Sequence, residues 1–245
     1  MYNRDLTYNW KVVPICDKQL LDVDSNDVLF SGDFRKCNVY KSGGGYDKFP
    51  DMCERRFNIR LSNQFVVQLF GCPLNCKYCY VTKEGVWGKY KEYTTVELVD
   101  FFIESGQEIF HLMGGSPALY IEHWEKIIKL LPSYSVFHSD LLLVEKDYTE
   151  DIIKSIKGHN TLYAVSIKGA DSEEFLKNTR AKLNEKRFFN NLDLIVDLEL
   201  DFYITYTGMS RDSIDKFEHM FTKRYGYFSS IESFSIDIID YNAIK

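Results

Sequence analysis

Residues 72–79 read Cys72-Pro73-Leu74-Asn75-Cys76-Lys77-Tyr78-Cys79, and the run Gln64-Phe65-Val66-Val67-Gln68-Leu69-Phe70 stands just before them. The apolar, β-prone run predicts a buried strand, so the cysteines occupy the loop that leaves its end. Three thiolates in one loop can converge on a metal site, but a [4Fe–4S] cluster or a tetrahedral zinc ion needs four ligands. The loop alone would therefore leave one coordination position open for chemistry.

Apolar runs and longer helical stretches alternate from this loop to the end of the chain. The predicted strands are residues 64–70, 108–113, 134–138, 162–167, 202–206 and 231–239. The predicted helices are residues 94–104, 121–131, 149–157, 185–198 and 210–225. A repeat of roughly 30 residues is the length of a βαβ unit. The alternation therefore predicts a parallel sheet with right-handed crossovers.

The number of strands and their order predict where a site would form. Six units are fewer than the eight of a closed barrel, so we expect an α/β fold with a partial (β/α)6 barrel. Ligands of such sheets bind at the carboxyl ends of the strands. The residues expected to meet there are Cys72, the Gly114-Gly115 turn, Asp140, Lys168 and Thr207.

Residues 1–62 have a different character, because they are polar and rich in predicted loops. They contain Ser42-Gly43-Gly44-Gly45, but no strand precedes it closely enough for a phosphate-binding loop. We expect an irregular N-terminal cap or lid, and not an independent domain. Residues 63–245 are then assigned to the barrel.

Composition limits the function classes. The 245 residues carry a net charge of −6, and the longest basic runs are Arg55-Arg56 and Lys223-Arg224. A nucleic-acid partner is therefore not expected. The sequence shows neither a signal peptide nor a run of transmembrane length, so we expect a cytoplasmic protein without a membrane partner. Its six cysteines would then be reduced and available for metal or redox chemistry.

The cysteine loop resembles a known signature. Its C-x3-C-x2-C spacing after the first barrel strand, with Tyr78 beside the last cysteine, is similar to that of the radical SAM superfamily. Gly114-Gly115-Ser116-Pro117, at the end of the second strand, resembles the Gly-Gly-Glu-Pro turn of that family, with Ser116 in place of the acid. The family's turn binds the amino group of the methionine half of S-adenosylmethionine (SAM), and glycines allow a close backbone approach.

Two further stretches look like the activating-enzyme branch of the family, typified by pyruvate formate-lyase activating enzyme. They are residues 166–171, Ser-Ile-Lys-Gly-Ala-Asp, and residues 206–212, Tyr-Thr-Gly-Met-Ser-Arg-Asp. Two departures are visible: Ser166 stands where the branch has Asp, and no histidine follows the fifth strand. The resemblance covers residues 63–239.

The resemblance implies a cofactor set and a reaction. Cys72, Cys76 and Cys79 would bind three irons of a [4Fe–4S] cluster, and SAM would bind the fourth iron. One electron then cleaves SAM to methionine and a 5′-deoxyadenosyl radical, which takes a hydrogen atom from the substrate. A low-potential donor such as flavodoxin or ferredoxin would supply that electron. The residues expected to contact SAM are Tyr78, Gly114, Gly115, Ser116, Pro117, Asp140, Ser166, Lys168 and Thr207.

The substrate stays open at this point. One hypothesis is a peptide or protein substrate, either for installing a glycyl radical or for modifying a ribosomal peptide. The alternative is a small molecule of cofactor, nucleoside or natural-product biosynthesis. A third hypothesis is a non-catalytic zinc module with Cys53 or His111 as the fourth ligand. No second cysteine pair of the kind typical of structural zinc sites accompanies the triplet.

Three more cysteines precede the loop, at positions 16, 37 and 53. Their spacing matches no ligand motif, which favours ordinary buried thiols. An auxiliary cluster bound by Cys16, Cys37 and Cys53 is the alternative. His138 lies near the end of its predicted strand, where it could reach the site.

Overall fold

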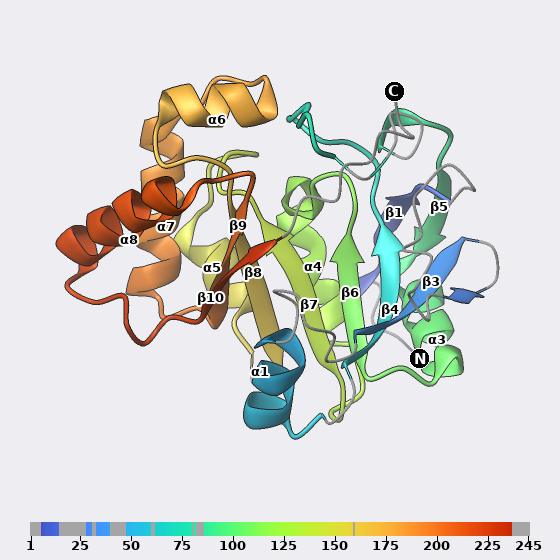
Figure 1. Ribbon diagram of the computed structural model, residues 1–245. Coiled ribbons are helices and arrows are strands. Elements are labelled where there is room, and N and C mark those ends of the chain that lie inside the picture. The colour runs from blue at the N-terminus through green and yellow to red at the C-terminus, as the bar shows by residue number, and fades with distance from the viewer. Residues whose placement is uncertain are drawn as a thin grey trace.

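The computed structural model describes residues 6–14, 28–30, 33–39, 48–59, 62–79, 81, 86–158 and 160–236. Its centre is one sheet of eight strands in the spatial order β10-β9-β8-β7-β6-β4-β3-β2 (Figure 1). Six of these strands are parallel neighbours. They are β4 (Ser62–Gln68), β6 (Ile109–Met113), β7 (Val136–Leu141), β8 (Thr161–Ile167), β9 (Phe202–Thr207) and β10 (Ser233–Ile236). The predicted α/β fold with a partial (β/α)6 barrel is confirmed.

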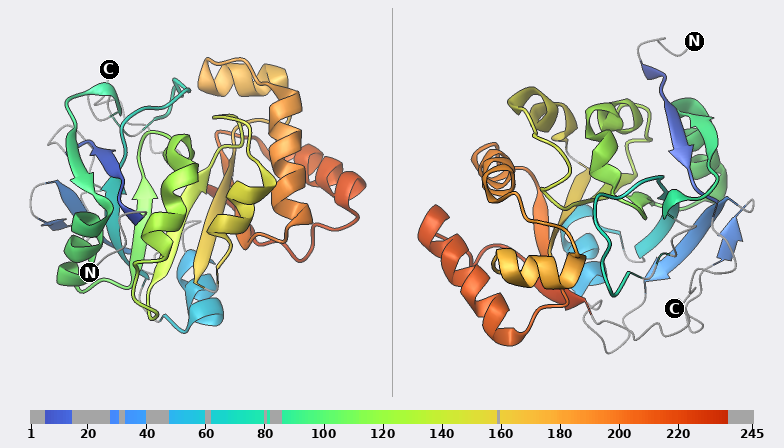
Figure 2. Two further views of the ribbon diagram at one scale, coloured as in Figure 1. Left: turned by 180° about the vertical axis from the view of Figure 1, so that it is seen from behind. Right: turned by 90° about the horizontal axis from the view of Figure 1, so that it is seen from above.

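Helices follow the parallel strands, and most of them cover one face of the sheet (Figure 2). They are α3 (Thr95–Ser105), η3 (Pro117–His123) continuing into α4 (Trp124–Ile128), α5 (Glu150–Ile156), α6 (Ser172–Thr179), α7 (Glu185–Asp197) and α8 (Arg211–Tyr225). Alternate strand residues such as Phe110, Tyr163 and Ile204 point into the core beneath them. None of the helices in the described segments is long and apolar enough to cross a membrane.

The first 62 residues contain more regular structure than their polarity predicts. β3 (Phe34–Val39) pairs antiparallel with β4, and β2 (Val28–Phe30) pairs with β3, so both extend the sheet. β1 (Asn9–Val12) pairs antiparallel with β5 (Lys91–Thr94). The Ser42–Gly45 run lies outside the described residues. The division into a cap (1–62) and a barrel (63–245) stays a prediction.

Helix α1 (Lys48–Phe57) lies against the other face of the sheet, near the amino ends of the strands (Figure 1). Phe49, Met52 and Cys53 form one buried cluster with Ile109 and Val136, the first residues of β6 and β7. Ion pairs of Arg56 with Asp201 and Glu232 tie the helix to the segments before β9 and β10. Apolar side chains therefore fill the barrel interior at the amino ends of the strands.

Candidate active site

The cysteine loop begins at the carboxyl end of β4, and its sulfurs share one electrostatic environment. Desolvation raises the pKa of all three thiols, that of Cys72 to about 12. The three groups also act on one another, because ionised Cys76 and Cys79 raise the pKa of Cys72. The positive charge of Lys168 acts in the other direction and lowers the pKa of Cys76 and Cys79. Neutral thiols of this kind become thiolates when a metal binds and its positive charge replaces the protons.

The donor set fits an iron–sulfur cluster. In the described part of the chain, no three His, Cys, Asp or Glu side chains gather closely enough to hold a metal ion. A cluster does not need its thiolates to meet on one ion, because each of them binds a different iron. Cys72, Cys76 and Cys79 are therefore the residues that would hold it.

The other cysteines do not join this loop. Cys53 packs beside Ile109 at the start of β6, whereas the loop leaves the carboxyl end of β4. A strand of five residues spans about 16 Å, so the hypothesis of Cys53 as a fourth zinc ligand is wrong. Cys16 and the side chain of Cys37 lie outside the described residues, and an auxiliary cluster bound by Cys16, Cys37 and Cys53 stays a prediction.

Distant segments hold the loop by its backbone. Gly71 N donates to Val86 O at 2.8 Å, Asn75 N to Thr179 O at 2.9 Å and Lys77 N to Asn178 O at 3.1 Å. The Asn178 side chain, at the end of α6, donates to Lys168 O (2.9 Å) and to Gly208 O (3.0 Å). The loops after β4, β8 and β9 therefore meet at one asparagine.

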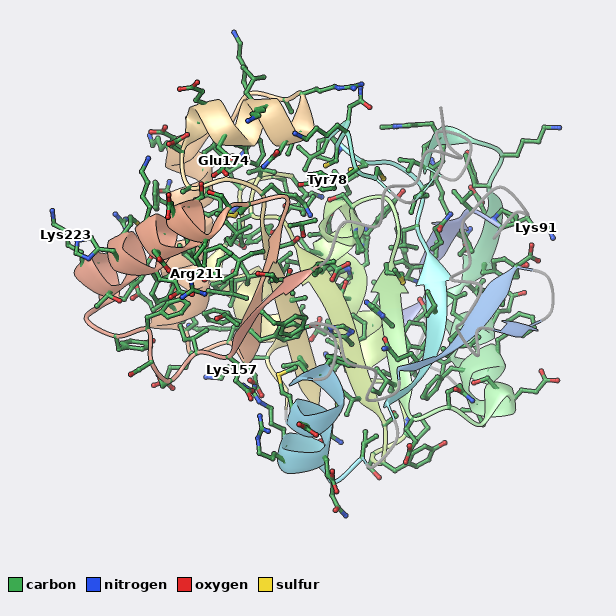
Figure 3. All side chains as sticks on the ribbon, viewed as in Figure 1. Tyr78, Lys91, Lys157, Glu174, Arg211 and Lys223 are labelled. Atoms are coloured by element: carbon green, nitrogen blue, oxygen red, sulfur yellow. The ribbon has the colours of Figure 1, made fainter. Side chains whose placement is uncertain are left out.

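Tyr78 lies between the loops that follow β8 and β9 (Figure 3). Its hydroxyl donates to Thr207 O at 3.1 Å, and Lys168 Nζ is 5.7 Å from the centre of its ring. A Cβ on Gly208 would lie 2.6 Å from the ring, and Gly208 has a φ of +74°. Glycine is thus required where the chain passes this tyrosine.

The turn at residues 114–117 packs against the base of the cysteine loop. Gly115 has a φ of +59°, and a Cβ there would lie 2.4 Å from Gly71 O and 2.5 Å from Leu69 O. Ser116 N donates to Gly71 O at 2.7 Å. The contact with the loop backbone already requires the glycine, before any ligand is considered. The contact of Gly114, Gly115, Ser116 and Pro117 with SAM stays a prediction.

A carboxylate from the loop after β7 braces this turn. Ser116 Oγ and Leu142 N donate to Glu145 Oε1, each at 3.0 Å. Val144 N (3.0 Å) and the Tyr148 hydroxyl (3.1 Å) donate to Oε2. Four bonds hold a carboxylate whose pKa burial raises. No sequence signal marks Glu145, because its partners are backbone amides and two hydroxyls.

Asp140, Ser166 and Lys168 come from neighbouring strands. Lys168 Nζ donates to Ser166 Oγ at 2.8 Å. Asp140 pairs with Ala164 inside the sheet and not in a loop, because β7 continues to Leu141. Burial raises the pKa of Asp140 to about 6, and Lys168 limits this rise.

Thr207 is the last residue of β9, and its Oγ1 is buried without a hydrogen-bond partner in the described residues. Thr207 is the last of the residues that the sequence predicts to contact SAM. The structure thus brings Tyr78, Ser166, Lys168 and Thr207 around the cysteine loop, and Gly114–Pro117 against its base.

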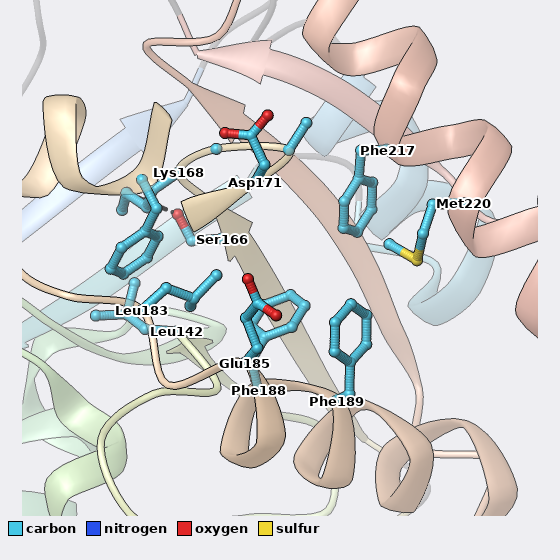
Figure 4. A pocket seen from close by; sticks show the side chains of 13 residues that line it. Leu142, Ser166, Lys168, Asp171, Leu183, Glu185, Phe188, Phe189, Phe217 and Met220 are labelled. Carbon is cyan, nitrogen blue, oxygen red and sulfur yellow. Dashed lines mark hydrogen bonds between the residues drawn. The ribbon is translucent and has the colours of Figure 1, made fainter. Parts of the chain in front are cut away.

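A pocket of about 190 Å³ opens beside Lys168, between the loop after β8 and helices α6 to α8 (Figure 4). Its polar lining consists of Ser166, Lys168, Asp171 and Glu185. The apolar lining comes from Leu142, Ala170, Phe175, Leu183, Phe188, Phe189, Phe217 and Met220. These residues come from separate elements and look like ordinary core positions in the sequence, so no pattern predicted the pocket.

The fold resembles several solved structures. The structure of TYW1 with a lysine-pyruvate adduct bound has a TM-score of 0.57 and 15% identity, over 85% of this chain and 77% of that one. The Streptococcus suis SuiB structure bound to S-adenosylmethionine gives 0.52 and 11%, over 80% and 44%. Native anSMEcpe with bound AdoMet gives 0.51 and 18%, over 71% and 52%. The chain thus spans about half the length of anSMEcpe.

No curated protein matches the chain. A family profile described as "Radical SAM superfamily" matches residues 66–223, which is more than half of the sequence. That range contains the cysteine loop, the glycine turn and every strand from β6 to β9. The chain therefore belongs to the radical SAM superfamily, whose members work with a [4Fe–4S] cluster and SAM.

Proposed function

We propose that this radical SAM enzyme takes a hydrogen atom from a peptide or protein substrate, either to install a glycyl radical or to modify a ribosomal peptide. Cys72, Cys76 and Cys79 would hold the cluster. When bound, the cluster supplies the electron that cleaves SAM to methionine and a 5′-deoxyadenosyl radical. The stretches 166–171 and 206–212 support the activating-enzyme branch within this proposal.

One observation carries the proposal: the barrel interior changes from apolar to polar toward the cysteine loop. At the amino ends of the strands, Ile109 and Val136 pack against α1. Further along the strands, the buried atoms His138 Nδ1 and Thr207 Oγ1 have no hydrogen-bond partner in the described residues. Buried polar atoms normally have partners, so these atoms favour a polar ligand or water in the interior.

The interior offers both kinds of hydrogen-bonding group to such a ligand. Asp140 lies on the same strand face as His138, and Tyr203 hydroxyl is 3.0 Å from His138 Nε2. Burial lowers the pKa of His138 to about 3, so its imidazole is neutral and its free nitrogen is a weakly basic acceptor or a donor. A peptide backbone carries the matching donors and acceptors. The structure of native anSMEcpe with bound AdoMet and the Cp18Cys peptide, of TM-score 0.50 and 18% identity, is a peptide complex with a similar fold.

A small polar molecule is the second candidate, and the position of α1 favours it. Phe49 of α1 lies 5.0 Å from the His138 ring and 6.0 Å from the Tyr203 ring, measured between centres. The helix therefore limits how deeply a substrate can enter. That limit suits either a compact molecule or a single residue of a peptide.

The remaining parts of the proposal follow from the cofactor. An [4Fe–4S] cluster of low potential needs a one-electron donor such as flavodoxin or ferredoxin. Thiols that must stay reduced until iron arrives are typical of the cytoplasm, which we propose as the location.

The test is anaerobic reconstitution with iron and sulfide, followed by reductant and SAM. We expect 5′-deoxyadenosine from the wild type and neither cluster nor product from Cys76→Ala. Cys53→Ala is the matched control, because its thiol lies in the apolar cluster around α1, and it should keep both. Stoichiometric zinc binding without 5′-deoxyadenosine would refute the enzyme function. Candidate peptides and small polar molecules are then compared by transfer of substrate deuterium into 5′-deoxyadenosine.

A further inference from the structure

Lys168 separates two environments. On one side its ammonium group is 5.7 Å from the centre of the ring of Tyr78, a residue of the cysteine loop. On the other side it lines the 190 Å³ pocket of Figure 4, together with Ser166. A group held in this pocket would therefore lie next to the cysteine loop, with one side chain between them.

The walls of the pocket are apolar and come from three helices. Phe175 of α6, Phe188 of α7 and Phe217 of α8 are all more than nine-tenths buried. Phe189 and Met220 are half-buried and complete the wall (Figure 4). Protein interiors rarely leave such apolar walls unfilled, because each missing neighbour costs dispersion contacts. A cavity of about 150 Å³ lined by apolar side chains can hold a benzene ring, so the volume here suits one ring or one branched side chain.

The polar groups at the pocket already have partners in the chain. Lys168 Nζ donates to Ser166 Oγ at 2.8 Å, and Ser172 Oγ donates to Glu185 Oε1 at 2.5 Å. Asp171 accepts bonds from Glu174 N (2.9 Å) and Lys216 Nζ (2.5 Å). An apolar group in the pocket leaves these bonds intact and meets the apolar walls with its surface.

We propose that this pocket binds one apolar side chain of the substrate, aromatic or branched aliphatic, next to the residue that is to lose its hydrogen atom. The inference rests on the proposed function, because it names the kind of peptide that the same site would accept. The substrate would place polar backbone groups in the barrel interior and an apolar side chain in the pocket. Such a substrate is larger than a single small polar molecule.

The test uses the methyl group of Met220 as a reporter inside the pocket. The 245-residue chain has five methionines, so [13C-methyl]methionine labelling gives few signals, and Met220→Leu identifies the one that matters. N-acetyl-L-phenylalanine amide is expected to shift this signal upfield through its ring current and to saturate in the millimolar range. N-acetylglycine amide is the matched probe without a side chain, and it should leave the signal in place.

A variant and a control locate the binding. Ala170→Leu adds a side chain to the pocket lining and should weaken binding of the phenylalanine probe at least tenfold. Tyr134→Ala removes an exposed aromatic ring of the loop before β7 and should leave the binding unchanged. An undisturbed titration in Ala170→Leu, or no Met220 shift in the wild type, would overturn the proposal.

Adenosine is the third probe, because the nucleoside half of SAM also contains a flat ring. A Met220 shift with adenosine that competes with the phenylalanine probe would assign the pocket to SAM and overturn the proposal. The titrations need no turnover, so they are independent of the 5′-deoxyadenosine assay. Loss of the Met220 shift with 5′-deoxyadenosine still formed refutes the pocket alone, whereas the reverse pattern refutes the proposed reaction.

Discussion

Replacing Asp140 by asparagine should stabilise the protein above pH 7 and leave its stability below pH 4 unchanged. Burial raises the pKa of this carboxyl from 3.8 to about 6 in the folded protein, against the smaller effect of Lys168. At neutral pH the fold therefore has to hold an ionised carboxylate in a site that favours the acid. Asparagine has almost the same shape and no charge to hold.

The magnitude follows from the pKa shift. Each pKa unit corresponds to about 1.4 kcal/mol, so a rise of about two units costs roughly 3 kcal/mol of folding free energy at neutral pH. Because the folded pKa is the higher one, the contribution of Asp140 is fully present below pH 3.8 and is lost as the pH rises through 6. The gain from Asp140→Asn should therefore increase from near zero at pH 4 to about 3 kcal/mol at pH 7.5.

Urea unfolding of the metal-free chain between pH 4 and 8 measures this difference. Asp197→Asn, at an exposed position at the end of α7, is the matched control and should leave the free energy of unfolding nearly unchanged. An Asp140→Asn protein that is equally or less stable than the wild type at every pH would refute the reasoning. Asp140 would then be better stabilised as an anion than its burial implies.

Three further predictions concern the same site. Gly115→Ala places a Cβ 2.4 Å from Gly71 O at a φ of +59°, so urea unfolding should show that the free energy of unfolding falls by about 3 kcal/mol or more. The control Gly226→Ala has a φ of +79° but open space around it, and it should lower the free energy of unfolding by about 1 kcal/mol. Equal losses in the two variants would contradict the contact between Gly115 and the loop. Asn178→Ala removes the bonds to Lys168 O and Gly208 O. It should lower the free energy of unfolding by about 2 kcal/mol and speed hydrogen exchange at the amides of Asn75 and Lys77. The control Asn160→Ala loses a bond to Ser133 O and should leave hydrogen exchange in residues 72–79 unchanged. His138→Gln should remove an acid sensitivity: burial lowers the pKa of His138 to about 3, so its contribution is present above pH 6.5 and is lost as the pH falls, by roughly 3 kcal/mol between pH 6.5 and 4. The effect is best measured in the Asp140→Asn background, because Asp140 changes the stability in the opposite direction as the pH falls. If His138→Gln leaves the loss of stability between pH 6.5 and 4 unchanged, the prediction is wrong.

The barrel could be predicted because its strands carry their pattern locally. β8, Thr161–Ile167, is buried along its whole length and reads as an apolar run. β3 has the sequence Phe-Arg-Lys-Cys-Asn-Val and joins the sheet through its backbone bonds to β4. α6 has eight residues, of which Phe175 is its one buried hydrophobic side chain. Elements of this kind depend on distant neighbours and leave little trace in the sequence.

Some parts of the site could be predicted from the sequence and others could not, for the same reason. The cysteine spacing and the glycine turn are contiguous, so a single stretch of sequence predicts each of them. The brace at Glu145, the junction at Asn178 and the apolar pocket are made by residues from loops and helices far apart in the chain. Their chemistry becomes visible when the fold brings them together.

The backbone bonds around the cysteine loop also set an order of events during folding. Val13 N donates to Gln68 O and Phe70 N to Lys11 O, while Asn75 N bonds to Thr179 O. The loop is thus anchored to segments roughly 60 residues before it and 100 residues after it, and such long-range contacts form late because chain entropy opposes them. On the ribosome, the loop cannot acquire its final shape until α6 has emerged. Iron delivery therefore meets either an unfinished loop or a nearly complete barrel, and the chain has to remain soluble with three free thiols until then.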